Sequence, residues 1–206
     1  MYAADNDADV INMSLQQIFR MREQPGHVAV FNRAINYATD RGTVVVVAAG
    51  NDSRNMDRDS DTYQAYCQSP GVVCVSATGP TSSEQPFLGP WENVDAQAPY
   101  SNYGSPITVA APGGSDYGFV LGACSGTTLL FAHCREDRFL IAQVGTSFAA
   151  PHVSGLAALL VEDIGKNRPS EVAAQIRKSA DDLGKPGKDA IYGQGRINVA
   201  KALKLE

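Results

Sequence analysis

The sequence lacks a long uninterrupted hydrophobic run and an excess of basic residues, and each absence excludes a class of protein. Phe139–Val161 contains no Asp, Glu, Lys or Arg, but glycine, proline and hydroxyl-bearing residues interrupt it, so it is unlike a membrane-spanning helix. The 17 Lys and Arg against 22 Asp and Glu give a net charge of −5. Binding to nucleic acid needs clustered basic residues, so we expect neither a membrane nor a nucleic acid as a partner.

The first residues also lack the features of a signal peptide. Met1–Asp9 has no basic region followed by an apolar one. It leads directly into Val10–Ser14, whose apolar and β-branched residues are typical of a buried strand. A start so close to a buried strand predicts that the sequence begins inside a larger domain.

Strand-like and helix-like segments alternate along the 206 residues. Thr43–Ala49 is hydrophobic at nearly every position, which is typical of a parallel strand covered by helices on both faces. Val153–Val161 is apolar nearly all round and predicts a buried central helix. This alternation predicts one α/β domain, a three-layer sandwich with a mostly parallel sheet.

Further elements follow from local patterns. Polar loops are predicted after Leu15 and over Asp52–Gln68. The remaining strands are expected at Val10–Leu15, Gly71–Ala77 and Ile107–Ala111. The remaining helices are expected over 31–38 with Gly42 as the terminating glycine, from an N-cap at Ser170, and over 197–203.

The segment Gly145–Gly155, GTSFAAPHVSG, places Ser147 at the start of the predicted central helix. A hydroxyl there lies near the positive end of the helix dipole, where a developing oxyanion would also be stabilised. The small side chains of Ala149 and Ala150 would let a substrate backbone approach. Pro151 is expected in the first turn, where its missing N–H costs little. A lone serine before a helix is most often an N-cap, so a catalytic role for Ser147 depends on the whole segment.

Five segments, in the same order, resemble motifs of the subtilases, the subtilisin-like serine proteases. GTSFAAPHVSGLAALL around Ser147 resembles the family's nucleophile motif, and VVVVAAGND over 44–52 resembles the strand and turn that carry its oxyanion asparagine. The others are DVINMSL over 9–15, YSNYGSPITVAAPG over 100–113 and YGQGRINVAKAL over 192–203. The resemblance covers almost the whole chain. It implies a subtilisin-like fold and a serine endopeptidase that hydrolyses peptide bonds through an acyl-enzyme on the serine.

The resemblance also implies roles for single residues. Ser147 would be the nucleophile, and the Asn51 side chain would donate to the oxyanion together with the Ser147 backbone N–H. Without the family, Asn51 is better explained as a turn residue after Gly50, since Asn-Asp favours turns. A polypeptide substrate would pair as an added β-strand beside the scissile bond. The residues implied to bind it are Ser14, Leu15, Ala48, Ala49 and Gly50.

The sequence departs from the family in two ways. Gln16 and Gln17 stand where the family usually has Gly-Gly, so their side chains are expected to crowd the pocket for the substrate residue before the scissile bond. The family's aspartate in D-[ST]-G and histidine in H-G-[TS] are absent. We expect structural or solvated roles for the three histidines present, His27, His133 and His152.

The missing base leaves several interpretations. In the first, residues 1–206 are a single partial peptidase domain, the C-terminal two-thirds of a subtilisin-like catalytic domain that lacks its N-terminal strands. Met1 would then be internal, the complete enzyme a monomer, and this chain alone inactive, because a serine nucleophile needs a general base. In the second, the chain is a catalytically inactive, subtilase-like peptide-binding module. A third, weaker interpretation is a split enzyme completed by a second chain.

The four cysteines bear on where the protein works. They allow three sets of disulfide pairs, of which two local loops, Cys67–Cys74 and Cys124–Cys134, are the simplest. Four reduced thiols are the alternative. Disulfides favour an oxidising compartment, and with the family resemblance they imply an extracellular, secreted protein.

The sequence points to no catalytic metal. No pair of cysteines or histidines has zinc-binding spacing. Asp57, Asp59 and Asp61 form D-x-D-x-D, but the other residues of an EF-hand loop are missing, so a solvated acidic loop is predicted. The implied chemistry requires no cofactor. Because many subtilases bind calcium, the resemblance leaves open a structural calcium ion on backbone carbonyls near Cys67–Val72.

Overall fold

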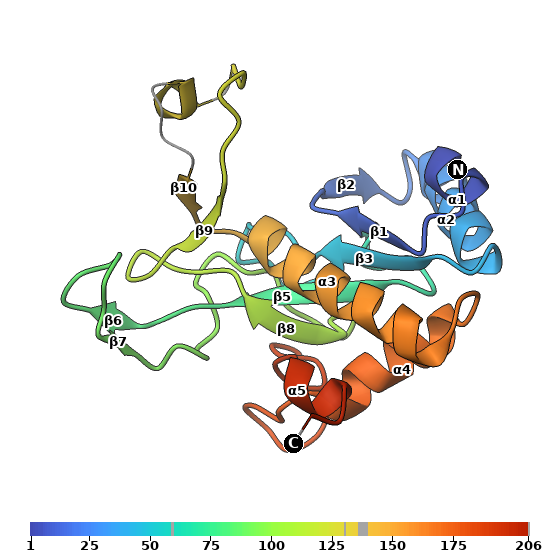
Figure 1. Cartoon of the computed structure of the whole chain (residues 1–206). Helices are drawn as coiled ribbons and strands as arrows, with labels where there is room; N and C mark the ends of the chain where they lie inside the picture. Colours follow the sequence, from blue (N-terminus) through green and yellow to red (C-terminus); the bar gives the residue numbers. More distant parts are fainter. Residues whose placement is uncertain (59, 130, 136–139, 206) are drawn as a thin grey trace.

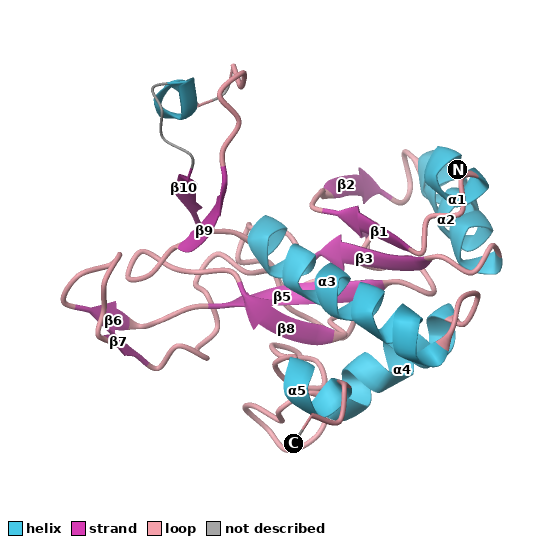
Figure 2. Ribbon diagram, in the orientation of Figure 1, coloured by secondary structure: helices cyan, strands magenta, loops and turns pink. Residues whose placement is uncertain are grey.

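A four-stranded parallel sheet forms the centre of the computed structural model, which describes residues 1–58, 60–129, 131–135 and 140–205 (Figures 1 and 2). All neighbouring strands run parallel, with Val46 paired to Asn12 on one side and to Val73 on the other. The predicted α/β fold with a mostly parallel sheet is confirmed. In spatial order the strands are β1 (Val10–Met13), β3 (Val44–Ala48), β5 (Val73–Thr78) and β8 (Val109–Pro112).

Helices cover both faces of this sheet, as the apolar sequence of β3 predicts. Every residue of β3 is buried, and alternate residues point to opposite faces. One set packs with α3 (Thr146–Ile164) and α4 (Pro169–Ser179), and the other packs on the side of α2 (Pro25–Asp40). Figure 1 shows α3 and α4 in front of the sheet, with α5 (Val199–Ala202) beside α4 and α1 (Tyr2–Asp5) near α2.

The central helix is longer than predicted. α3 starts at Thr146, before the predicted segment, and its buried residues include Val153, Leu156 and Leu160. Pro151 consequently lies in the second turn and not in the first, which corrects the prediction for that residue. Within the described residues, no helix is both long and apolar enough to cross a bilayer.

Two short strands lie where polar loops are predicted. β2 (Gln17–Arg20) pairs antiparallel with β4 (Thr62–Ala65). Phe19 and Ala65 are buried in a small apolar cluster, whereas most of the strand residues beside them are polar. Four residues with one or two inward side chains give too short an alternation to be recognised in a sequence.

Helix starts and the edge of the sheet also differ from prediction. α2 starts at Pro25, so His27 lies on a helix and not in a loop. α4 starts at Pro169, which makes Ser170 a first-turn residue and not the N-cap. Proline suits both starts because the first N–H of a helix has no partner within it. β1 is half-buried because it is the edge strand of the described sheet and has one neighbour.

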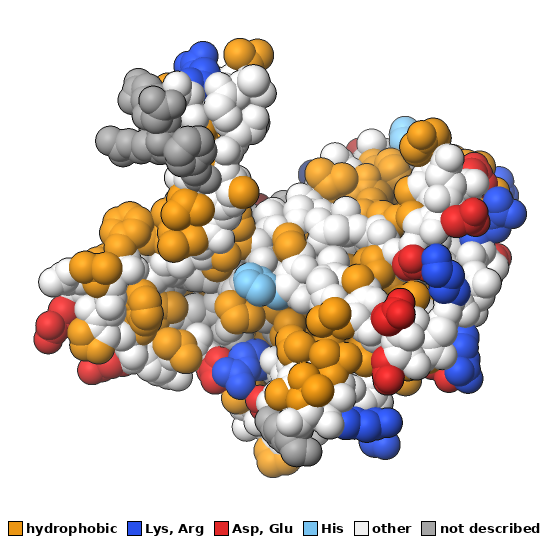
Figure 3. Space-filling view, in the orientation of Figure 1, with side chains coloured by type: hydrophobic (Ala, Val, Ile, Leu, Met, Phe, Trp, Pro, Cys, Tyr) orange, Lys and Arg blue, Asp and Glu red, His pale blue; other side chains and the backbone are white. Residues whose placement is uncertain are grey.

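Two hairpins extend beyond the carboxyl ends of β5 and β8 (Figure 1). β6 (Ser82–Ser83) pairs with β7 (Trp91–Glu92), and β9 (Val120–Ala123) pairs with β10 (Leu140–Gln143). A short 3-10 helix, η1 (Ala132–Arg135), lies at the far end of the second hairpin. Hydrophobic side chains gather over both hairpins in Figure 3. The exposed ones include Phe87, Leu88, Trp91, Leu121 and Leu140.

The structure contains both predicted disulfides. Cys67–Cys74 joins the segment after β4 to β5, with the two Cα atoms 5.1 Å apart. Cys124–Cys134 closes the β9–β10 hairpin, with the two Cα atoms 5.5 Å apart. The two bonds use all four cysteines, so the alternative of reduced thiols does not hold in this structure.

A cluster of charged side chains fixes the C-terminal segment. Asp181 accepts hydrogen bonds from Arg196, Asn198 and Lys201, with 2.8 Å between its carboxylate and Arg196 Nη2. Arg196 also binds both carboxylate oxygens of Asp95 at 2.8 Å. The Lys201 ammonium, with help from Arg196 and Asn198, holds the pKa of Asp181 below its usual value.

We expect Asp181→Asn to lower the free energy of unfolding by about 1–3 kcal/mol at neutral pH, because charged hydrogen bonds are lost. A depressed carboxyl pKa gives stability that is complete above the unfolded pKa, about 3.9, and lost as the pH falls through the folded pKa. The variant and the parent should therefore converge in strong acid. Urea unfolding at neutral pH and at about pH 3 measures this, with Asp182→Asn as the control. A difference that does not shrink in acid would contradict the expectation.

Candidate active site

Ser147 lies in the first turn of α3. The residue just before this helix, Gly145, has a φ of 149°, a backbone conformation that favours glycine. Its N–H donates to the carbonyl oxygen of Gly113 and to the Tyr100 hydroxyl, and each N···O distance is 2.9 Å. Backbone N–H groups in the first turn have no partner within the helix. The half-buried Ser147 therefore presents its N–H and hydroxyl at the positive end of the helix dipole.

Asn51 follows β3, and Thr146 holds its amide in one orientation. Asn51 Oδ1 accepts from the Thr146 N–H at 2.9 Å and from the Thr146 hydroxyl at 2.8 Å. Because Oδ1 faces both donors, Nδ2 is turned toward Gly145. A β carbon placed on Gly145 would lie 3.4 Å from Asn51 Nδ2 and 3.7 Å from Ser147 N. Both nitrogens therefore lie near one point beside Gly145, and an oxyanion hole needs two such N–H groups on the same side of the reacting carbonyl.

Thr146 is a site residue that the sequence analysis does not identify. Its side chain is fully buried, at 0% exposure. Its hydroxyl accepts the Gly50 N–H at 3.0 Å and donates to Asn51 Oδ1, so it links the turn after β3 to the start of α3. Its position between Gly145 and Ser147 is the one sequence signal for this role.

We expect Thr146→Val to lower the free energy of unfolding by about 1–3 kcal/mol, although valine has nearly the same shape. The loss of the hydroxyl leaves the buried Gly50 N–H without its acceptor and removes one donor to Asn51. Denaturant unfolding measures the loss, and Thr146→Ser is the matched control because it keeps the hydroxyl. Equal losses in both variants would show that packing of the methyl group, and not the hydrogen bonds, is responsible.

The end of β1 is bonded directly to Ser147. The Ser14 hydroxyl donates to the Ser147 carbonyl oxygen over 2.8 Å, and the Ser147 hydroxyl lies 3.5 Å from the Ser14 carbonyl oxygen. In a regular helix the Ser147 carbonyl would accept from the N–H of residue 151. Residue 151 is a proline and has no N–H, so this carbonyl is available to Ser14.

The other residues implied to bind substrate differ in exposure. Leu15 is 58% exposed, whereas the side chains of Ala48 and Ala49 are buried in the core. Gly50 has a φ of 101°, which favours glycine. The Ala49 carbonyl accepts hydrogen bonds from the side chains of Gln64 and Asn102. The turn after β3 is therefore bonded to buried amides on its inner side.

The described histidine rings are engaged away from Ser147. His152 Nδ1 lies 2.9 Å from the carbonyl oxygen of Phe148, one turn earlier on α3. His27 stacks on Phe19, with 5.6 Å between ring centroids. The side chain of His133 lies outside what the structure describes. Among the described contacts of the Ser147 hydroxyl, the partner is the Ser14 carbonyl, and neither a histidine nor a carboxylate is bonded to it.

Tyr100 supports the loop before α3. Its hydroxyl lies 2.8 Å from the carbonyl oxygens of Gly113 and Gly114 and accepts the Gly145 N–H. Burial raises the pKa of Tyr100 well above its usual range, so the hydroxyl stays protonated and can donate. Tyr100 belongs to the family-like segment over 100–113, but no local sequence pattern predicts this role.

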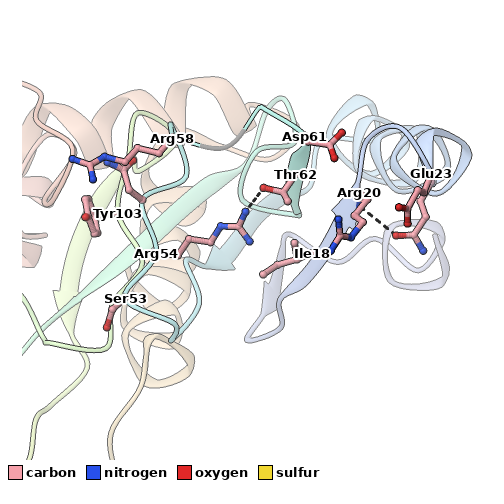
Figure 4. Close-up of a pocket in the computed structure, with 11 residues that line it drawn as sticks. Ile18, Arg20, Glu23, Ser53, Arg54, Arg58, Asp61, Thr62 and Tyr103 are labelled. Atoms are coloured by element: carbon pink, nitrogen blue, oxygen red, sulfur yellow. Dashed lines mark hydrogen bonds between the residues drawn. The ribbon is translucent and has the colours of Figure 1, made fainter.

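A cavity of about 950 Å³ lies beside the turn that carries Asn51, and neither Asn51 nor Ser147 lines it (Figure 4). In Figure 4, Arg54 reaches from the turn toward Thr62, its hydrogen-bond partner, and Arg20 faces it with Ile18 between them. Acidic side chains stand at one end of the same cavity. With both signs of charge in its lining, the cavity does not point to one class of ligand.

The candidate calcium residues have other partners. Asp57 accepts from the N–H and hydroxyl of Ser105 at 2.6–3.0 Å, and Asp61 forms an ion pair of 3.3 Å with Arg22. Asp59 lies outside the described residues. In the part of the chain that the structure describes, no three His, Cys, Asp or Glu side chains come together as metal ligands. A calcium ion near Cys67–Val72 would have to rest on backbone carbonyls.

Comparison with known proteins agrees with this geometry. The model of the Subtilase family matches residues 1–195. The "Thermophilic serine proteinase" of Bacillus sp. (strain AK1) is 32% identical over 203 residues, covering 98% of this chain and 39% of that protein. The "Extracellular protease" of Xanthomonas campestris pv. campestris is 37% identical over 202 residues, covering 96% of this chain and 29% of that protein.

Solved structures agree as well. A structure described as a lanthipeptide protease has a TM-score of 0.81 and 30% identity, covering 99% of this chain and 63% of that one. The chain spans between 29% and 57% of the length of the first three curated relatives it matches.

Proposed function

Because the chain belongs to the subtilase family, we propose that it forms the nucleophile-bearing part of a serine endopeptidase of the subtilisin type. The observation that carries the proposal is that Asn51 Nδ2 and Ser147 N lie near the same point beside Gly145, 3.4 and 3.7 Å from a β carbon placed on that glycine. In this proposal Ser147 is the nucleophile and Asn51 completes the oxyanion hole. The residues before the scissile bond lie between Ser14 and Leu15 on one side and Ala48–Gly50 on the other.

The proposed reaction has two steps. The Ser147 hydroxyl attacks the scissile carbonyl carbon and passes its proton to a general base, and the carbonyl oxygen gains negative charge. Asn51 Nδ2 and the Ser147 N–H donate to that oxygen, and the amine leaves with a proton, forming the acyl-enzyme. Water then attacks the ester and releases the acid product. No step uses a metal or an organic cofactor, and a calcium ion on the carbonyls near Cys67–Val72 would be structural.

The proposed reaction also needs a general base. Neither the D-[ST]-G nor the H-G-[TS] motif occurs in the sequence. We propose that the aspartate and histidine come from a segment outside these 206 residues. Residues 1–206 are then a single partial peptidase domain, and the complete enzyme is a monomer. Two disulfides and a relative named as an extracellular protease support an extracellular site of action, with polypeptides as substrates.

The test is to supply the missing segment. Residues 1–206 are joined at Met1 to the N-terminal part of a subtilase catalytic domain that contains both motifs, and hydrolysis of casein is measured. We expect activity from the fusion and at most weak activity from the chain alone. A fusion that folds and binds peptides but does not cleave them would favour the alternative, an inactive peptide-binding module. Strong cleavage by the chain alone, lost in Ser147→Ala, would overturn the idea that the base lies elsewhere.

A further inference from the structure

Three side-chain amides converge on Gly50, in the turn after β3 that forms one side of the proposed substrate site. A β carbon placed on Gly50 would lie 1.7 Å from Gln16 Oε1, 2.5 Å from Asn102 Nδ2 and 2.7 Å from Gln64 Nε2. No other residue type fits at this position with the amides where they are. The amides of Gln16, Gln64 and Asn102 therefore fill the space beside the Gly50 backbone.

The Gln16 amide is anchored at both ends. Its Oε1 accepts the Asn51 backbone N–H at 3.2 Å, and its Nε2 donates to Asp52 Oδ2 at 2.5 Å. Gln16 starts two residues after Ser14, on the wall opposite the Ala48–Gly50 turn. Its side chain therefore crosses from one wall of the cleft to the other and is bonded to the residue that carries the proposed oxyanion amide.

Two buried amides lie behind Gln16. Gln64 is 2% exposed and donates to the Ala49 carbonyl, and its Oε1 accepts from Asn102 Nδ2 at 3.1 Å. Asn102 is fully buried, and its Oδ1 accepts the N–H groups of Asp52 and Arg54, each at 2.9 Å. Because these amides are paired with one another and with the backbone, moving them would leave buried polar groups unsatisfied. They form a fixed floor, while Gln16 forms the exposed cover.

From this arrangement we infer that Gln16 is a specificity-determining residue that restricts the substrate residue before the scissile bond, P1, to a small side chain such as glycine, alanine or serine. The inference rests on the proposed function, because it assigns a preference to that same cleft. A bulky P1 side chain would have to displace the Gln16 amide from Asn51 and Asp52 and would then meet the polar floor. A small P1 residue leaves both hydrogen bonds in place.

The test compares P1 preference in variants of the fused enzyme. Peptides that differ only in alanine or phenylalanine at P1 are assayed, and the ratio of kcat/KM for phenylalanine over alanine is compared between proteins. Gln16→Gly should raise this ratio by about 10- to 100-fold, because apolar contacts of this size discriminate by that amount. Asp52→Ala removes one hydrogen-bond partner of the Gln16 amide but leaves the Gln16 side chain at full length, so it should give an intermediate ratio. Gln17→Gly is the matched control. The sequence predicts that both glutamines crowd this pocket, but the Gln17 amide donates to the Ile18 carbonyl at 3.2 Å and, unlike Gln16, is not bonded to Asn51 or Asp52, so its loss should leave the ratio unchanged.

A binding measurement on residues 1–206 distinguishes a failure of the Gln16 inference from a failure of the proposed function. Isothermal titration with product-like peptides ending in alanine or phenylalanine should show the same rise in the relative affinity for phenylalanine in Gln16→Gly, with no catalysis needed. An unchanged ratio in Gln16→Gly, in a protein that cleaves or binds peptides, overturns the inference and leaves the proposed function standing. Absence of both cleavage and binding in every variant overturns the proposed function and, with it, the inference.

Discussion

Ser147→Ala in the fused enzyme is expected to reduce kcat by about 10⁶-fold, which is the loss seen when subtilisin, a member of the same family, loses its serine. The physical reason is that, in the proposed reaction, the Ser147 hydroxyl is the group that forms the acyl-enzyme. Alanine keeps the helical backbone, so the Ser147 N–H and the Asn51 amide remain as oxyanion donors. The residual rate should therefore stay above that of the uncatalysed reaction. Steady-state hydrolysis of a chromogenic peptide measures both quantities.

The control for this substitution lies on the same helix. The Ser154 hydroxyl lies 2.9 Å from Asn12 Oδ1 and 3.1 Å from the Ala150 carbonyl oxygen, and donates its one proton to one or the other. Ser154→Ala should change kcat by less than about tenfold. If Ser147→Ala retains more than about a hundredth of the activity, Ser147 is not the nucleophile.

If Asn51 has the proposed oxyanion role, Asn51→Leu should lower kcat by about 10²–10³-fold, the loss known for the oxyanion-hole asparagine of subtilisin. Little change in KM is expected. The Asn51 amide would donate to charge that develops only in the transition state, so its loss should not weaken substrate binding. Leucine also leaves the Thr146 N–H and hydroxyl without their shared acceptor. A loss of stability of about 1–3 kcal/mol should accompany the kinetic effect.

Stability and catalysis can be separated in this variant. Assays are run at a temperature at which unfolding curves show both proteins fully folded. Asn55→Leu, in the same loop, serves as the control because Asn55 Oδ1 accepts the Asp57 N–H and no bond from Thr146. An increase in KM at constant kcat would mean that Asn51 contributes to ground-state binding and not to the oxyanion hole.

The central layers could be predicted because their sequence patterns are long and unambiguous. Five consecutive buried residues in β3 allow few alternatives to a strand covered on both faces. The nearly all-round apolar character of 153–161 similarly predicts the helix that packs against that sheet. The candidate site residues Ser147 and Asn51 are predicted from family motifs, and local sequence patterns alone would indicate a helix cap and a turn.

The polar contacts around the site could not be predicted, because they join residues far apart in the chain. The bond from Thr146 to Asn51 spans 95 positions and depends on how α3 meets the end of β3. β2 and β4 were missed because each buries one or two side chains in a polar context. Gln16 was recognised as a departure from the family, but its two anchors, at Asn51 and Asp52, became apparent only in three dimensions.

The proline in α3 has a consequence for protein design. Since residue 151 supplies no N–H, the turn that carries Ser147 is attached to the strand end through Ser14 and is correspondingly less attached to the rest of its own helix. A graft of the eleven residues 145–155 onto another scaffold would transfer the sequence of the turn without the bond that orients it. The smallest transplantable unit is therefore discontinuous. It consists of the helix start together with a strand that ends in a hydroxyl-bearing residue at the position of Ser14.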